Sequence, residues 1–109
     1  MKIIYNKIIP FGRRFYAINL CGVLFAKGPC DRRMLNHERI HTAQIKELAY
    51  IGFYIWYVLE WLVRLLVRRG DTFKAYRDIS FEREAYANEG DYGYLRQRRR
   101  YSFLRYLRR

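Results

Sequence analysis

The chain has 109 residues, which is enough for one domain with a modest hydrophobic core and too few for two. Half of the residues are hydrophobic (51%) and 18% are aromatic, which excludes a disordered chain despite a net charge of +12. Two cysteines, Cys21 and Cys30, are too few for a disulfide framework and fit no metal or redox spacing, so we expect two reduced thiols.

The first 29 residues carry the signals of strands. Runs rich in β-branched and aromatic residues occupy 3–5, 14–18 and 23–25, and turn residues separate them at 10–12 and 21–22. This pattern predicts a small antiparallel sheet of two or three strands, and hence an α+β domain that spans 1–109. The stretch 1–12 has no apolar run of secretory length, which favours a cytoplasmic location.

A long helical pattern follows from about 31 to 69. Asp31 is a suitable N-cap, and Gly70 stands after the basic pair 68–69, where a helix C-terminus is expected. A helix of roughly 38 residues is about 57 Å long, which is too long for so small a domain. We therefore expect a bend near Gly52.

The stretch 48–67 is apolar except for Glu60 and Arg64. It is long enough for a membrane span, but each charge is costly near the centre of a bilayer. The two charged residues are four apart, so they are expected to pair on one helix face. A buried core helix, a helix on a membrane surface and a true span all stay open.

The rest of the chain is shorter and more polar. Residues 70–78 predict a connection or a weak helical turn, and a second helix is expected from Ile79 or Ser80 to Asn88. The basic end, 94–109, is expected to be a surface tail, rich in arginine and without acids after position 91. Such a tail suits an anionic membrane surface, nucleic acid or an acidic partner, or serves only solubility.

The segment 36–41, NHERIH, contains the pattern H-E-x-x-H with the only two histidines of the chain. On a helix, His37 and His41 lie one turn apart and project from the same face, so both imidazoles can bind one Zn²⁺. Glu38 follows the first histidine and is placed to take a proton from water. The segment predicts a zinc hydrolase with Glu38 as its base.

A catalytic zinc ion usually has three protein ligands, and the chain has no third histidine. A carboxylate is therefore expected as the third ligand. The candidates are Glu82, Glu84 and Glu89 in the segment 80–89, SFEREAYANE, with Glu60 more remote.

The segments 36–44 and 81–88 together resemble the gluzincin metallopeptidases, which include thermolysin-like enzymes and antibiotic-sensing membrane peptidases. In that family a glutamate on a second helix is the third ligand, within the pattern E-x-x-(small)-(Asp). The resemblance implies that Glu84 is the ligand and that Ala87 takes the small position. Asn88 then stands where the family has an aspartate that orients a ligand histidine, and Glu89 is the alternative source of that carboxylate.

The resemblance also implies a site for an extended peptide. In zincins the edge of a sheet lies above the metal-binding helix, and 23–27 is expected to be that edge. Donors to a developing oxyanion are expected among Tyr86, Tyr92 and Tyr94, while Gln44 is expected to line the site or face solvent.

The sequence thus predicts a zinc metallopeptidase that binds Zn²⁺ through His37, His41 and Glu84. Its predicted partners are a peptide or protein substrate and an anionic membrane surface, with nucleic acid favoured less. The rival interpretation is a zinc-stabilised basic module without catalysis, which binds a membrane surface or nucleic acid.

Overall fold

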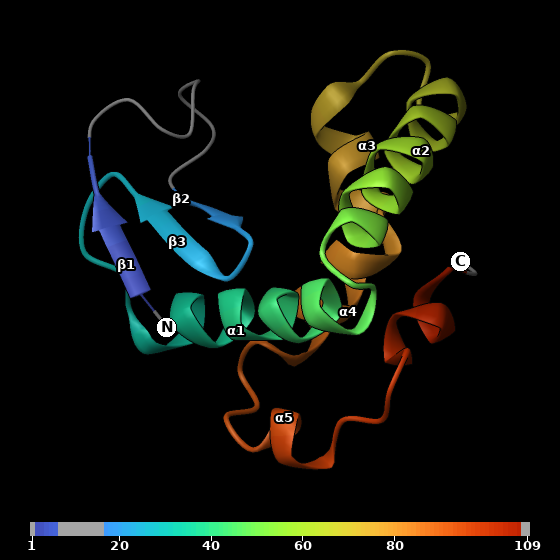
Figure 1. Cartoon of the computed structure of the whole chain (residues 1–109). Helices are drawn as coiled ribbons and strands as arrows, with labels where there is room; N and C mark the ends of the chain where they lie inside the picture. The colour runs from blue at the N-terminus through green and yellow to red at the C-terminus, as the bar shows by residue number, and fades with distance from the viewer. Residues whose placement is uncertain (1, 7–16, 108–109) are drawn as a thin grey trace.

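The computed structural model describes residues 2–6 and 17–107, and it is an α+β fold (Figure 1). A three-stranded sheet comes first and helices follow. The elements in chain order are β1 (Lys2–Tyr5), β2 (Ala17–Leu20), β3 (Val23–Ala26), α1 (Arg32–Glu47), α2 (Ile51–Val67), α3 (Thr72–Asp78), α4 (Ser80–Asn88), α5 (Tyr94–Gln97) and the 3₁₀ helix η1 (Ser102–Tyr106).

The sheet is mixed rather than antiparallel, and its strand order is β1-β3-β2. The β2–β3 hairpin turns at Cys21 and Gly22, which both have positive φ (54° and 90°), as a two-residue type I′ turn requires. β1 pairs with β3 in parallel, so the expectation of a purely antiparallel sheet was wrong. The chain leaves β1 and returns as β2 on the far side of β3. The turn at 10–12 and the expected strand residues 14–16 lie outside the described residues.

The long helical segment is two helices that meet at an angle of 110°. Asp31 caps α1 as expected, since its side chain accepts a hydrogen bond from Met34 N–H. The chain breaks at 48–50, close to the bend that was expected near Gly52. Ala49 has a φ of 56°, and Tyr50 N–H donates back to Ile45 C=O, so α1 ends in a Schellman-type motif without glycine.

The apolar helix α2 ends near Gly70, as expected, and Gly70 N–H donates to Leu65 C=O. The segment 70–78, which was expected to be a connection or a weak helical turn, forms the seven-residue helix α3, with Asp71 as its N-cap. Glu60 of α2 accepts hydrogen bonds from the backbone N–H and the hydroxyl of Ser80, both at 2.6 Å, at the start of α4. Glu60 also pairs with Arg64 at 3.6 Å, as the four-residue spacing predicted.

The core lies where α1, α2, α4 and η1 meet, and it is largely aromatic (Figure 1). Phe81 at the start of α4 is fully buried, with ring centroids 4.5 Å from those of both Phe53 and Phe103. These contacts hold α4 against α2 and η1, and Ile45 of α1 belongs to the same buried cluster, which positions α4 beside α1.

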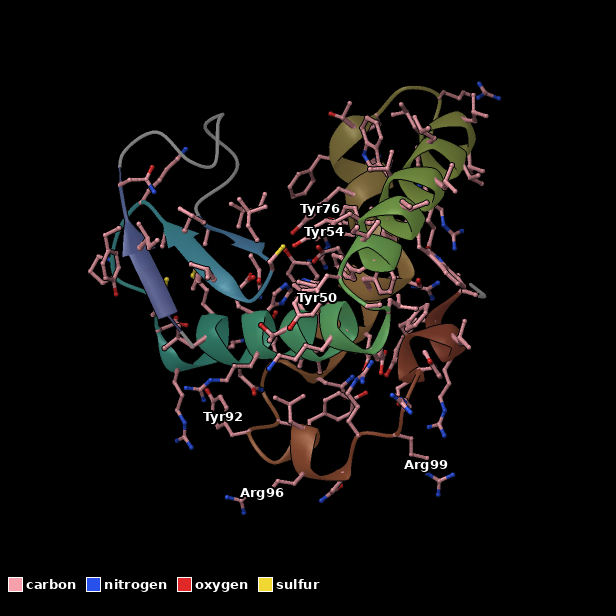
Figure 2. All side chains as sticks on the ribbon, viewed as in Figure 1. Tyr50, Tyr54, Tyr76, Tyr92, Arg96 and Arg99 are labelled. Atoms are coloured by element: carbon pink, nitrogen blue, oxygen red, sulfur yellow. The ribbon has the colours of Figure 1, made fainter. Side chains whose placement is uncertain are left out.

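The C-terminal region packs onto the fold and is not a free tail. Phe103 is buried in the core, and the Arg98 guanidinium is buried between the carboxylates of Glu47 and Glu84. Other arginines of this region, such as Arg96 and Arg99, extend outward (Figure 2).

Among the described residues, no single helix has both the length and the apolar character needed to cross a bilayer. The bent pair of α1 and α2 meets these criteria only when the two helices are taken together.

Candidate metal centre

The two histidines lie on one buried face of α1, as the H-E-x-x-H spacing predicted. His37 and His41 are only 7% and 5% exposed. Their Nε2 atoms are 3.1 Å apart, so both rings present the same nitrogen to one point.

The carboxylate at that point belongs to Glu82 of α4. Its Oε1 atom lies 3.3 Å from His37 Nε2 and 3.0 Å from His41 Nε2. The placement of Glu84 beside the histidines was therefore wrong. Residues two apart on a helix differ in direction by about 200°, so only one of Glu82 and Glu84 can face the two histidines.

Glu84 belongs to a different buried network. Its carboxylate accepts hydrogen bonds from Arg98, from the Tyr94 hydroxyl at 2.6 Å and from Gln44 Nε2 at 3.0 Å. This carboxylate is fully buried, and its contacts join α1, α4 and the C-terminal region. Its role is to hold the scaffold of the site together.

The other ring nitrogen of each histidine faces a hydrogen-bond acceptor. His37 Nδ1 lies 3.0 Å from Glu89 Oε1, and His41 Nδ1 lies 2.7 Å from Gln44 Oε1. The Gln44 amide nitrogen is committed to the Phe81 carbonyl and to Glu84, which leaves its oxygen for His41. Each Nδ1–H can therefore donate, which leaves the lone pair of each Nε2 free for a metal.

Glu89, rather than Asn88, is therefore the residue whose carboxylate faces the Nδ1 atom of His37. Asn88 does not contact either imidazole, because its side-chain amide donates to Glu84 C=O and to the Tyr106 hydroxyl. Glu82 and Glu89 are seven residues apart and lie at one face of α4, and this shared face is the signal in the sequence that pairs them.

The ligand atoms have the spacing of a zinc site. The two Nε2 atoms and Glu82 Oε1 are 3.0, 3.1 and 3.3 Å apart. Ligands about 2.0–2.1 Å from a tetrahedral zinc ion lie about 3.3 Å from one another. Two imidazoles and a carboxylate are also the donor set of known catalytic zinc sites.

Without a metal ion, a proton on His41 can supply the positive charge in the cluster. Burial disfavours the charged form of His41, but the Glu82 carboxylate outweighs burial and raises the pKa of His41 to about 9. Burial also disfavours the charged form of Glu82, but His41 and His37 more than compensate, so the pKa of Glu82 falls below its usual range. The site is therefore electrostatically built to hold a cation.

Glu38 lies beside this cluster. One ligand atom from each of His37, Glu38 and His41 falls within 4.8 Å of the other two. Burial is the main cause that raises the pKa of Glu38, with a smaller contribution from the charge of Glu82, while the two histidines oppose the shift. A carboxylate with a raised pKa is better suited to accept a proton and return it.

A cavity of about 570 Å³ opens onto the cluster. Glu38, His41 and Glu82 form its polar wall. Most of the remaining lining is apolar or aromatic and comes from β2, α2 and α3, including Ile18, Leu20, Phe53, Val58 and Trp61, with Ile45 of α1.

The edge of the described sheet beside this cavity is β2, not β3. All four β2 residues line the cavity, while β3 is the central strand between β1 and β2. Asn19 of β2 donates to Glu38 C=O at 2.9 Å and to the Thr42 hydroxyl at 2.8 Å, which ties this strand to α1. The expected edge at 23–27 was therefore one strand away from the cavity.

The tyrosines that line the cavity are not those expected as oxyanion donors. Tyr86 packs on His37, the Tyr92 ring lies under Arg32, and Tyr94 donates to Glu84. The lining tyrosines are instead Tyr54, Tyr57 and Tyr76.

These three tyrosines differ in how their hydroxyls are used. Tyr54 and Tyr76 reach toward the sheet from α2 and α3 (Figure 2). Tyr57 donates to Glu82 Oε2 at 2.8 Å, and Tyr54 donates to the Asn19 carbonyl. The Tyr76 hydroxyl lies 3.1 Å from that of Tyr86, and burial raises the pKa of Tyr76 far above its usual range. No motif in the sequence distinguishes these residues among eleven tyrosines.

Comparison with known proteins identified no relative of this chain. The chain matches no protein-family model, no curated protein and no protein of solved structure. The gluzincin resemblance therefore depends on the two short motifs alone, and the case for function depends on the geometry of the site.

Proposed function

We propose that this protein is a zinc-dependent hydrolase that cleaves amide bonds, most simply those of a peptide. The observation that carries the proposal is the convergence of His37 Nε2, His41 Nε2 and Glu82 Oε1 on one point beside Glu38. This convergence supports Glu82, in place of Glu84, as the third ligand.

The metal would supply Lewis acidity, which makes water acidic near neutral pH and polarises a carbonyl oxygen. Glu38 then accepts the proton of the attacking water and delivers it to the leaving amine. Glu89 and Gln44 keep both imidazoles in the ligand tautomer. Tyr76, on the cavity wall, is our candidate donor to the developing oxyanion.

The cavity supports a substrate with apolar side chains. Apart from the carboxylates and His41 at its polar wall, its lining side chains are uncharged. β2 is an edge strand of the described sheet and runs along this cavity, and an extended peptide can pair with such a strand through its main chain. Main-chain pairing favours an amide polymer over a small ester.

The test combines metal analysis with hydrolysis. Purified protein, stripped with a chelator and reloaded with Zn²⁺, should hold one zinc ion per chain and cleave quenched fluorescent peptides with large apolar residues. Glu38→Gln should keep the zinc ion and lose at least roughly 100-fold in rate, in line with a lost general base. Arg39→Gln, exposed on the same helix, is the matched control and should keep both.

Three results would overturn the proposal. A chain that binds no zinc would remove the metal centre, and full activity in Glu38→Gln would remove the mechanism. If zinc binds but Glu38→Gln weakens zinc binding as much as a ligand variant does, then Glu38 is a fourth ligand. The centre would then be structural rather than catalytic.

A further inference from the structure

Helix α2 exposes an apolar face that no described element covers. Phe53 and Glu60 are its only buried residues, although the helix is 17 residues long. Eight large aliphatic side chains are between 46% and 82% exposed: Ile51, Ile55, Val58, Leu59, Leu62, Val63, Leu66 and Val67. We call them the α2 strip.

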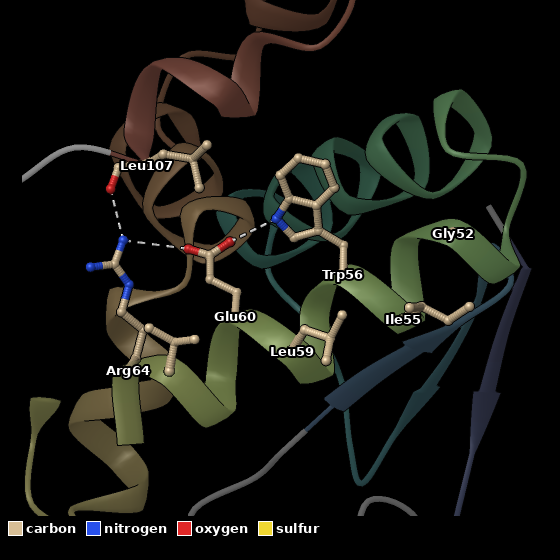
Figure 3. Close-up of a pocket in the computed structure, with 8 residues that line it drawn as sticks. Gly52, Ile55, Trp56, Leu59, Glu60, Arg64 and Leu107 are labelled. Atoms are coloured by element: carbon tan, nitrogen blue, oxygen red, sulfur yellow. Dashed lines mark hydrogen bonds and ion pairs between the residues drawn. The ribbon is translucent and has the colours of Figure 1, made fainter. Parts of the chain in front are cut away.

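The strip is continuous along the whole helix. At 3.6 residues per turn its members recur every three to four positions, so they cover one face about 25 Å long. Glu60 and Arg64 line the groove beside the strip, but their side chains are largely buried and pair with each other, so they do not interrupt the exposed apolar face (Figure 3). The Arg64 guanidinium also donates to the Leu107 carbonyl at 2.8 Å, at the end of an apolar groove of about 550 Å³ along the strip.

Few of the chain's acids are left to the described surface, because most of them are paired with arginines or buried. Glu47, Glu60, Glu84, Glu89 and Asp78 pair with arginines, and Glu38 and Glu82 are buried in the metal centre.

The three acids that remain exposed are Asp31, Asp71 and Asp91, and each accepts a local backbone N–H. The exposed cations Lys46 and Arg69 flank α2 in the chain, and η1 beside it carries exposed Arg105.

We propose that the α2 strip docks on an anionic lipid bilayer, with α2 lying in the plane of the interface. A helix with a wide apolar face and basic surroundings binds such an interface through apolar burial and attraction to acidic headgroups. A lipid surface suits this face better than a protein partner, because the exposed cations Lys46, Arg69 and Arg105 beside the apolar strip match acidic headgroups.

Docking would also place the metal centre close to the membrane. Val58 belongs to the strip and lines the cavity that contains His41 and Glu82. The mouth of the cavity and the docked face therefore adjoin. Docking itself does not require zinc.

The experiment is co-sedimentation of the full chain with vesicles of phosphatidylcholine, alone or with one-third phosphatidylglycerol. We expect binding to the anionic vesicles that weakens with salt and is unchanged by a zinc chelator. Leu59→Glu should weaken it at least roughly tenfold, because a carboxylate is driven out of the apolar interface. The matched control is Tyr5→Glu on β1, which changes the net charge equally at a site with the same 58% exposure. It should retain binding within about twofold.

Equal losses in both variants would show that net charge alone drives binding and would overturn docking through the strip. The proposal would also be overturned if the chain bound neither kind of vesicle. So would a stable dimer in light scattering that Leu59→Glu dissociates while vesicles bind nothing, because the strip would then join two copies. Leu66→Glu, at a position 82% exposed, repeats the test if Leu59→Glu fails to fold by circular dichroism.

Discussion

Replacing Glu82 and Glu84, the two buried glutamates of α4, one at a time distinguishes a metal ligand from a residue that supports the scaffold. Glu82→Gln keeps the shape of the side chain but removes the charge beside both Nε2 atoms. Zinc sites in small proteins bind with about 10–16 kcal/mol of apparent free energy, so one ligand contributes roughly 3 kcal/mol. That loss corresponds to a zinc affinity about 100-fold weaker.

Glu84→Gln should give the opposite result. It leaves the metal cluster intact but removes one of the two carboxylates that neutralise the Arg98 guanidinium, which is 5% exposed. Disrupting a buried ion pair costs about 3–5 kcal/mol, and the remaining Glu47 carboxylate places this case near the lower end. The melting temperature should fall by roughly 10–20 °C, while zinc affinity should stay within about tenfold of the original.

The assay is competition for zinc against a chromophoric chelator, at a temperature where both variants are folded. Circular dichroism melts of the metal-free proteins measure stability. The reasoning fails if Glu84→Gln loses as much zinc affinity as Glu82→Gln, or if Glu82→Gln binds zinc as tightly as the original chain.

Three further predictions follow from the site and its supports. Glu89→Gln weakens the acceptor of an imidazole N–H and should lower zinc affinity about 10- to 100-fold, measured by the same competition, and an unchanged affinity would remove its orienting role. The metal-free protein should lose stability as pH rises from about 6.5 toward 9, because the raised pKa of His41 means that its protonated form stabilises the folded state. This stabilisation is complete below pH 6.5 and is lost as His41 gives up its proton. It should also lose stability as pH falls below about 4.5, since the pKa of Glu82 is depressed on folding; urea titrations across pH that give a flat profile would contradict both statements. Phe81→Ala should cost about 3–5 kcal/mol in urea unfolding and also weaken zinc binding, while Phe73→Ala, at a position 37% exposed, should cost much less; equal losses would contradict the assignment of Phe81 to the core.

Local signals in the sequence predicted the elements that depend on neighbouring residues. Asp31 caps α1, α4 spans the expected residues, and Gly70 follows the end of α2. Each of these features is decided within a few positions of the chain, by a side chain that meets a free N–H or by a backbone that needs positive φ. A bend was expected near Gly52, but its exact place at Ala49 was not predicted, because an alanine in that conformation carries no local signature.

The sequence by itself determined that His37, Glu38 and His41 share one helical turn, because spacing along a helix fixes direction around its axis. Only the tertiary structure decided which carboxylate meets them. The burial of Phe81 and Ala85 sets the rotation of α4, and that rotation turns Glu82 toward the imidazoles and Glu84 toward Arg98. Packing between elements distant in the chain determines such a rotation, and a short motif does not record it.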